Sequence, residues 1–424
     1  MTGVLSDRQR DELHRSLLEY LHASEFSDTY DALKRDAGLD AYAPDPKSRY
    51  AGLLEKKWLS TIRLQKKNME LENKVRALEK ELDTTPNARR GAFVASWHPS
   101  TPRHTLLGHR QPITDAAFHP RFSMLATASE DMTIKIWDWE TGELEQTLKG
   151  HTKPVQSIAF DYGGKYLVSC SSDLAIKIWD ITEGWKNVRT MHGHEHSVSS
   201  ACFLPGDQHI ISASRDRTLK LWETATGFCT RTLRGHSDWV RAVTVSSDAR
   251  LFASASSDRT VRIWDAGTGE MRNELRGHEH VVECVMFAPA TAYAALCALG
   301  GIRAPRDESA AHSGQFLASG SRDKTIRLWT QQGQCIRVLA GHDNWVRALA
   351  FSPNGKYLLS VSDDKTMRVW DLASGRCIKA IDAHNHFCTS LAWGRSWVED
   401  NQVGRPVNVV ATGSVDLGVK VWAP

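Results

Sequence analysis

The sequence lacks the features that mark secreted, membrane-spanning and strongly nucleic-acid-binding proteins. No Asn-X-Ser/Thr sequon occurs, and the N-terminal MTGVLSDRQR has no apolar core typical of a signal peptide. No stretch approaches the roughly 18 consecutive apolar residues that a membrane span requires. The charges nearly cancel, because 53 Lys and Arg face 50 Asp and Glu, so net charge does not argue for nucleic acid or membrane insertion. We therefore expect a cytoplasmic protein.

Paired cysteines are missing as well. The eight cysteines form no CxxC pair and show no spacing typical of zinc ligands. We therefore predict buried free thiols in a reducing compartment, with no metal site and no cofactor. The cysteines are Cys170, Cys202, Cys229, Cys284, Cys297, Cys335, Cys377 and Cys388.

What the chain does have is an internal repeat. A His, usually preceded by Gly, recurs mostly every 42 or 43 residues, and an Asp followed six residues later by Trp recurs in step with it. Period-two stretches such as TIKIW and TVRIW lie between these anchors and indicate short, half-buried strands. The His positions are His109, His151, His194, His236, His278, His342 and His384, and the Asp/Trp pairs are Asp131/Trp137, Asp173/Trp179, Asp216/Trp222, Asp258/Trp264, Asp323/Trp329, Asp364/Trp370 and Asp416/Trp422.

Seven such units resemble the WD-repeat family, whose units are four-stranded propeller blades. The resemblance implies a mostly β fold with a seven-bladed propeller over residues 103–424. In each blade the His, the Asp, the Trp and a nearby Ser or Thr, for example Ser212 or Ser214, are expected to form one hydrogen-bonded set. Because the set recurs in every unit, we interpret it as structural and not catalytic. The segment RHTLLGH is expected to complete the last blade, which ends after Trp422.

Two units are longer than the rest. The fifth has 23 extra residues and the seventh has 10, counted between His and Asp. Both insertions fall between the first two strands of a blade. The fifth, within residues 288–314, is rich in Ala and Gly and contains an AAL stretch that could form a short helix; we assign it no ligand.

The N-terminal residues 7–39 have apolar positions at helical spacing. Ser24 and Ser27 are candidate caps of a second helix, and Gly38 is a candidate terminator. The text LLEYLHASEFSDTYDAL resembles the LisH motif, a dimerising helical module. Leu17, Leu21 and Phe26 are then candidate dimer contacts; the alternative is that the segment docks on its own propeller.

A heptad pattern follows over residues 54–82. Asn68 at an a position favours a two-stranded coil in register, and Lys67 and Lys74 at g positions favour a parallel pairing. We predict a short parallel coiled coil, with a lone solvated helix as the alternative. The candidate coil contacts are Leu64, Asn68, Leu71, Val75 and Leu78. Residues 83–102, which carry three Pro, are expected to form a linker.

The text WVRA occurs in two units only, following His236 and His342. The third and fifth residues after the repeat His vary freely among units, so the fold does not dictate them. The residue before the repeat Asp belongs to the same end of each blade, and it is Arg in two units. Trp and Arg are typical of protein-binding hot spots. We predict a docking rim for an acidic partner, formed by Arg215, Trp239, Arg241, Arg322, Trp345 and Arg347, with His386 and Phe387 beyond; the alternative is that the Trp side chains pack under loops and the Arg are solvated.

A LisH module, a short coiled coil and a seven-bladed propeller, in this order, resemble the lissencephaly family of dynein regulators, known in fungi as nuclear distribution proteins. SASRDRTLKLWE, HVVECVMFAP and AGHDNWVRALAFSP are especially similar. The resemblance implies a homodimeric adaptor that binds the cytoplasmic dynein heavy chain motor domain, works with NudE-type coiled-coil proteins in nuclear migration and spindle positioning, and resides at microtubule ends and spindle poles. In that family the basic and aromatic propeller face contacts the motor, which maps onto Arg215, Arg241, Arg322 and Trp345.

Other classes remain as alternatives. A substrate receptor or scaffold of a ubiquitin ligase would share the LisH module and the propeller, and a regulatory subunit of a lipid acetylhydrolase is also compatible. A phosphopeptide reader using Arg215 and Arg322 is a special case of the adaptor. An enzyme is not expected, because the chain has no P-loop, no GxSxG motif and no metal-ligand spacing.

Overall fold

The computed structural model describes residues 7–24, 26–39, 43, 101–302, 314–394 and 408–423. The chain divides into two compact units, Met1–Ser96 and Trp97–Pro424. Within the described residues, no helix is long and apolar enough to cross a bilayer.

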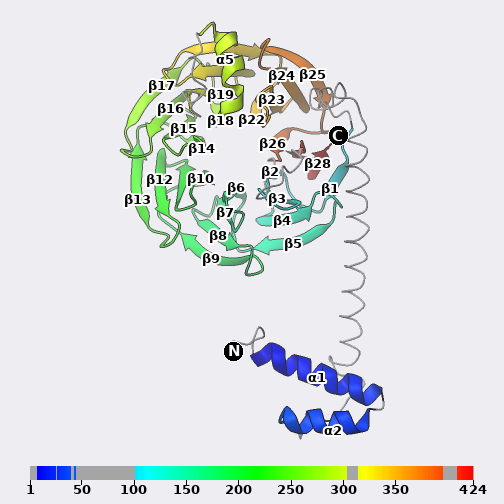
Figure 1. The fold of residues 1–424 in the computed structure, drawn as a ribbon. Helices are drawn as coiled ribbons and strands as arrows, with labels where there is room; N and C mark the ends of the chain where they lie inside the picture. Colours follow the sequence, from blue (N-terminus) through cyan, green and yellow to red (C-terminus); the bar gives the residue numbers. More distant parts are fainter. Residues whose placement is uncertain are drawn as a thin grey trace. The chain divides into compact units, whose positions relative to one another are not determined.

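The second unit is a ring of seven four-stranded antiparallel sheets, the blades of a propeller (Figure 1). Each of the first six blades is a meander of four consecutive strands, because short alternating segments are joined by tight turns. The strands of blades 1 to 4 are β2 (Ile113–Phe118), β3 (Met124–Ser129), β4 (Thr133–Asp138), β5 (Leu144–Lys149), β6 (Val155–Phe160), β7 (Tyr166–Ser171), β8 (Ile176–Asp180), β9 (Lys186–Met191), β10 (Val198–Phe203), β11 (His209–Ser214), β12 (Thr218–Glu223), β13 (Cys229–Arg234), β14 (Val240–Val245), β15 (Leu251–Ser256), β16 (Thr260–Asp265) and β17 (Met271–Arg276).

The seventh blade is closed by the start of the propeller sequence. Its outer strand is β1, which pairs antiparallel with β28 so that His104 lies opposite Val421. The expected closure by RHTLLGH is therefore confirmed, and it leaves no open sheet edge at the seam. The remaining strands are β18 (Val282–Phe287), β19 (Phe316–Ser321), β20 (Thr325–Thr330) and β21 (Cys335–Ala340) in blade 5, β22 (Val346–Phe351), β23 (Tyr357–Ser362), β24 (Thr366–Asp371) and β25 (Arg376–Asp382) in blade 6, and β26 (Cys388–Trp393), β27 (Val410–Ser414), β28 (Gly418–Trp422) and β1 (His104–Leu107) in blade 7.

The first strands of neighbouring blades contact one another around the centre of the ring. The fourth residue after each repeat His is fully buried there, as its apolar character predicts. Each apolar core cluster joins one blade to the next; for example, Val282 of blade 5 packs with Val261 and Ile263 of blade 4. The core is thus divided into seven interfaces between sheets.

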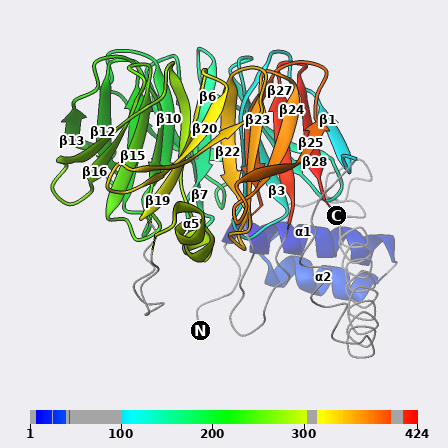
Figure 2. The same cartoon turned by 90° about the horizontal axis from the view of Figure 1, so that it is seen from above.

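The insertion in blade 5 forms a short 3-10 turn η1 (Ala290–Ala292) and the helix α5 (Tyr293–Gly300), which confirms the helix expected from AAL. Leu296 and Cys297 are buried against the sheets of blades 5 and 6. Figure 2 shows α5 at one edge of the propeller, viewed from the side. This is the end at which the first and second strands of a blade connect, opposite the turns that carry the repeat His and Asp. Residues 303–313 lie outside the described part.

The first unit contains α1 (Asp7–Ala23) and α2 (Ser27–Asp36), which contact each other. The cap predicted at Ser24 or Ser27 is wrong: Phe26 is the N-cap of α2, and no side chain caps the helix. The terminator at Gly38 is confirmed, since it has φ +64° and donates its N–H to the Arg35 carbonyl. The coiled-coil segment 54–82 and linker residues 83–100 fall outside the described residues.

All eight cysteines are free, as expected from their spacing. Their predicted burial is only partly correct, because Cys229 and Cys377 are exposed on the outer strands β13 and β25. An outer strand has one edge without a neighbour, so its side chains are less covered than those of inner strands. The prediction from composition could not distinguish inner from outer positions.

Candidate functional site

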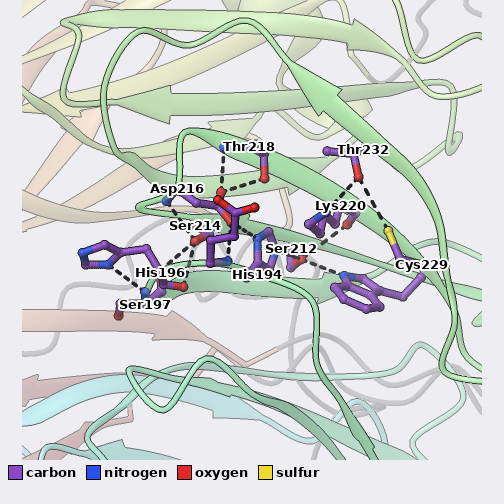
Figure 3. A network of polar contacts seen from close by, with 12 residues as sticks. His194, His196, Ser197, Ser212, Ser214, Asp216, Thr218, Lys220, Cys229 and Thr232 are labelled. Carbon is purple, nitrogen blue, oxygen red and sulfur yellow. Dashed lines mark hydrogen bonds and ion pairs between the residues drawn. The ribbon is translucent and has the colours of Figure 1, made fainter.

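The repeated His, Asp, Ser or Thr and Trp form the expected hydrogen-bonded set in every blade. In blade 3 (Figure 3), His194 Nδ1 lies 2.6 Å from Asp216, His194 Nε2 lies 2.7 Å from Ser212 Oγ, and Trp222 Nε1 donates to Ser212 at 2.8 Å. Ser212 is therefore the bridging hydroxyl, whereas Ser214 accepts the backbone N–H of Asp216. The bridging residues of the seven blades are Thr127, Ser169, Ser212, Ser254, Ser319, Ser360 and Thr412.

These sets are structural because their polar atoms are already used. Burial acts to raise the pKa of Asp216, but the hydrogen bonds from His194 and Thr218 hold it well below its usual range. The carboxylate also accepts the N–H of Glu195, so it ties the turn before the first strand to the turn after the second. The sevenfold recurrence and the closed bonding assign these four residues of each blade to the support of the turns.

Another position, equivalent in all seven blades, lies outside these hydrogen-bonded sets. The fifth residue after every repeat His is the extra residue of a β-bulge, where the pairing of the first strand with the second shifts by one. A bulge leaves its residue unpaired and re-aims its side chain. The seven bulge residues are Thr114, Gln156, Ser199, Arg241, Glu283, Arg347 and Thr389.

The first predicted cluster of the rim assembles across blades 3 and 4. The guanidinium of Arg215 lies 5.0 Å from the Trp239 ring centroid, and that of Arg241 lies 5.3 Å from it. Trp239 is exposed, and its ring also lies 5.9 Å from that of His196. One indole is thus held between two arginines from neighbouring blades.

The same arrangement is repeated across blades 5 and 6. Arg322 and Arg347 lie 4.1 Å and 4.9 Å from the Trp345 ring centroid. Here, however, both arginines have acidic partners: Arg322 pairs with Glu283, and Arg347 pairs with Asp363 at 2.8 Å and with Glu283 at 3.8 Å. The second cluster is therefore neutralised within the chain.

The first cluster retains more of its positive charge. Arg241 is bonded to a neutral hydroxyl, Ser257, at 3.0 Å. Burial lowers its pKa, and the charges of Arg215, Arg322 and Arg347 act in the same direction, against Glu283. The Nε of Arg215 is buried without a hydrogen-bond partner. A carboxylate of a bound protein placed near Trp239 would supply the negative charge that Arg215 and Arg241 lack within this chain.

A shallow pocket of about 390 Å³ adjoins this first cluster. Arg215, Trp239 and His196 contribute to its lining, together with Glu195 and Asp238. The mixed charges of its walls suit a peptide side chain better than an apolar small molecule. Within the described residues, no group of three or more His, Cys, Asp or Glu is placed to hold a metal ion.

The last two residues predicted for the rim lie apart from these clusters. His386 and Phe387 are exposed, and their rings contact each other at 4.5 Å. Among the described side chains, neither ring is stacked on an arginine. The structure thus brings six of the eight predicted rim residues into two Trp–Arg clusters and places His386 and Phe387 on blade 7, outside these clusters.

Glu283 and Asp363 were missed as members of the site. A signal was present: in units five and six, the bulge position and the residue before the repeat Asp carry opposite charges, Glu283 with Arg322 and Arg347 with Asp363. Pairing these two positions within each unit would have found both ion pairs.

Comparisons with known proteins agree with this architecture. The family described as "PAC1 LisH domain" matches residues 7–42, and "WD domain, G-beta repeat" matches residues 100–138, 142–180, 185–223, 227–265, 309–330 and 333–371. These repeat matches do not include β26 to β28, which nevertheless form a blade.

Full-length relatives share one name. A "Nuclear distribution protein PAC1" of Mycosarcoma maydis is 61% identical and covers 100% of this chain and 97% of its own length. Proteins of the same name from Coprinopsis cinerea and Cryptococcus neoformans are 57% and 62% identical, with 100% of both chains covered in each comparison.

Proposed function

Because this chain belongs to the family of nuclear distribution proteins PAC1, the fungal members of the lissencephaly family, we propose that it serves nuclear distribution as a non-enzymatic adaptor of cytoplasmic dynein. In this proposal it is a homodimer that binds the heavy chain motor domain, regulates microtubule attachment, and cooperates with a NudE-type coiled-coil protein. It acts at microtubule ends and spindle poles.

The observation that carries the proposal is the pair of Arg–Trp–Arg clusters on one face of the propeller. The exposed Trp239 ring and the half-buried Trp345 ring each lie beside two guanidinium groups. This is typical hot-spot chemistry, because it combines apolar area with charged hydrogen-bond donors. The rim holds four arginines and two acidic partners, Glu283 and Asp363. The excess positive charge favours an acidic surface on the motor domain.

Dimerisation is assigned to the N-terminal region. Phe26 is exposed, and Leu17 and Leu21 are half-buried in the single chain. A second copy would cover these side chains, and we retain Leu64, Asn68, Leu71, Val75 and Leu78 as coil contacts, on residues outside the described part. Full-length protein is expected at twice the 47.4 kDa chain mass by light scattering, and Phe26→Asp should shift it toward the single-chain mass.

The experiment that tests the adaptor role is binding of the full-length protein to a purified dynein motor domain. The double variant Arg241→Ala with Trp345→Ala should lose at least about tenfold in affinity, since it removes a side chain from each cluster. Arg272→Ala is the matched control, because it removes a cation from the outer strand β17 and leaves the rim intact. Circular dichroism would establish that each variant is folded.

Absence of binding by the native protein would overturn the dynein role. Binding that survives in the double variant would overturn the rim as its docking face. Purification with ligase subunits, and without dynein, would favour a substrate receptor instead.

A further inference from the structure

The turn that carries the repeat Asp contains a residue with an unusual backbone in every blade. The residue after the Asp has φ between +66° and +73° in all seven units, and none of the seven is Gly. This position lies on the turn before the third strand of a blade, and the rim residues lie at or next to the turns before the first and third strands. In an antiparallel meander these turns are at the same end of the blade, so the residues after the repeat Asp lie on the same face as the rim. The seven residues are Met132, Leu174, Arg217, Arg259, Lys324, Lys365 and Leu417.

These side chains divide the face into two contiguous halves. Blades 3 to 6, which carry the rim, have Arg or Lys at this position. Blades 7, 1 and 2, which adjoin one another through ring closure, have Leu417, Met132 and Leu174. The cationic half and the apolar half therefore meet around one ring.

The three apolar side chains are unfavourable for the isolated chain in two ways. A left-handed backbone conformation costs an L-residue with a Cβ roughly 1 kcal/mol relative to Gly. More than a third of the surface of each of these residues also stays in contact with solvent, since Met132, Leu174 and Leu417 are 43%, 37% and 36% exposed. Neither strain nor burial within the propeller explains the choice of Leu and Met at these positions.

Two further exposed apolar side chains extend this feature on blade 7. Leu107, 69% exposed, lies opposite Gly418, next to Leu417. Phe387, 37% exposed, accepts the backbone N–H of Val415 on its carbonyl, two residues before Leu417. We name the set of Leu107, Met132, Leu174, Phe387 and Leu417 the apolar arc.

We propose that the apolar arc is the second half of the docking face, and that it takes apolar side chains of the same protein partner whose acidic residues bind the rim. This inference rests on the proposed function and names further contacts for it. A rim of arginines supplies charge but little apolar area, whereas the desolvated centre of a stable interface is apolar. The arc supplies that area on the same face.

The distribution of charge identifies the kind of partner. A purely acidic ligand would be served by blades 3 to 6 alone, where Arg217, Arg259, Lys324 and Lys365 add to the rim. A purely apolar ligand would be served by blades 7, 1 and 2. A partner that spans the face needs an acidic surface next to an exposed apolar patch, and we assign both to the dynein motor domain.

The left-handed backbone allows a test that separates binding from folding. In the triple variant Met132→Gly, Leu174→Gly, Leu417→Gly, each turn is relaxed and each apolar side chain is lost. The melting temperature should stay the same or rise, because Gly adopts φ near +70° without strain. Affinity for the purified motor domain should fall at least about tenfold, from the apolar contacts removed.

Ala249→Gly is the matched control, because Ala249 has φ +57° on the opposite face, in the turn between β14 and β15. It should leave affinity unchanged. A second variant, Leu174→Asn with Leu417→Asn, keeps a side chain that tolerates the left-handed region and removes only the apolar surface. It should lose affinity as well.

Four outcomes are distinguishable in parallel assays with the rim variant. Loss of affinity in both the rim and arc variants, at unchanged or higher stability, supports the proposal. Loss in the rim variant alone overturns the arc and leaves the adaptor function standing. An arc variant that binds more weakly because it melts earlier also overturns the argument, since the turns were then structural. A native protein that does not bind the motor domain overturns both.

Discussion

Replacing one carboxylate of a repeat set should destabilise the propeller by a predictable amount. Asp258 of blade 4 accepts four hydrogen bonds: Oδ2 from His236 Nδ1 at 2.7 Å and the Ser237 N–H at 3.1 Å, and Oδ1 from the Thr260 N–H at 3.0 Å and its hydroxyl at 2.7 Å. Asp258→Asn preserves the shape and one oxygen. The new amide NH₂ must then face two donors.

The size of the effect follows from the two donors that lose their acceptor oxygen. A buried donor left without a partner costs about 1–3 kcal/mol, so we expect a loss of roughly 4 kcal/mol in the free energy of unfolding. A domain of roughly 320 residues unfolds with about 0.7 kcal/mol/K of entropy, which converts this loss into about 6 °C of melting temperature. The removal of charge adds to the effect, because the hydrogen bonds from His236 and Thr260 hold the pKa of Asp258 well below its usual range despite its burial.

Scanning calorimetry of the full-length protein measures this shift. Asp238→Asn is the matched control: Asp238 accepts the Trp239 N–H at 2.7 Å, and blade 6 uses Asn344 for the same bond to Trp345 at 2.9 Å. It should melt within about 1 °C of the native protein. Equal melting of the two variants would refute the assignment of the set as a structural element.

The pH dependence supplies a second check on the same variant. Since the pKa of Asp258 is lowered on folding, its ionised form stabilises the native state above its usual pKa of about 4 and stops doing so as the pH falls below it. The difference in stability between the native protein and Asp258→Asn should therefore narrow on acidification. A difference that stays constant down to pH 2 would contradict the hydrogen-bonding argument.

Three further predictions concern the packing between blades and the thiols. Gly355→Ala should lower the free energy of unfolding by more than about 2 kcal/mol, because Gly355 has φ +68° and a Cβ there would lie 2.3 Å from backbone atoms of the blade 5 insertion. Gly206→Ala, at φ +93° with open space around it, should lower it by about 1 kcal/mol. Chemical denaturation measures both values. Burial raises the pKa of Asp115 to about 6, so the free energy of unfolding should fall by up to about 3 kcal/mol as the pH rises from 4 to 7, and Asp115→Asn should abolish that slope. Cys229 should react with a maleimide in the native protein, whereas the buried Cys170, whose pKa is raised well above its usual range by burial, should react only on unfolding. Equal rates would contradict the assigned burial of Cys170.

The sequence predicts the propeller well because each blade repeats the same physical requirements. The spacing of His236, Asp258 and Trp264 marks the ends of strands, and the fourth residue after the His marks the inner strand. Ring closure is predicted by the segment RHTLLGH, which resembles an outer strand but precedes β2 and has no blade of its own before it. A single blade would give a weak signal, but seven in register leave few alternative folds.

The structure of the N-terminal unit is less predictable from its sequence, because it has no internal repeat. Ser27 satisfies the compositional rule for an N-cap, yet it is the first residue of α2, and Phe26 takes the cap position without a side-chain bond. Capping depends on where the preceding turn places the backbone, and the N–H of Phe26 is bonded to the Leu21 carbonyl. That turn is set by the contact between the two helices, which local sequence rules do not include.

The rim was predictable in its membership but not in its energetics. Aligning the units identifies Arg215, Trp239 and Arg241 as one neighbourhood, because freely varying positions on one face are not required by the fold. The alignment cannot show that Arg322 and Arg347 are neutralised by Glu283 and Asp363. That difference depends on side-chain directions at the bulge.

The β-bulge explains how every repeat unit can keep the same strand pairing while the residue at the bulge varies from blade to blade. Its residue is exempt from strand pairing, so its identity changes from Thr in blade 1 to Arg in blades 4 and 6 while its neighbours keep the sheet in register. In blades 7 and 1 the bulge threonines, Thr389 and Thr114, donate to the carbonyls of Ile113 and Val155 and so join each of these blades to the following one. Charged residues stand at the bulge in blades 4 to 6, where they are Arg241, Glu283 and Arg347. Together with Arg215 and Arg322, which precede the repeat Asp of blades 3 and 5, these residues make up the charged part of the rim.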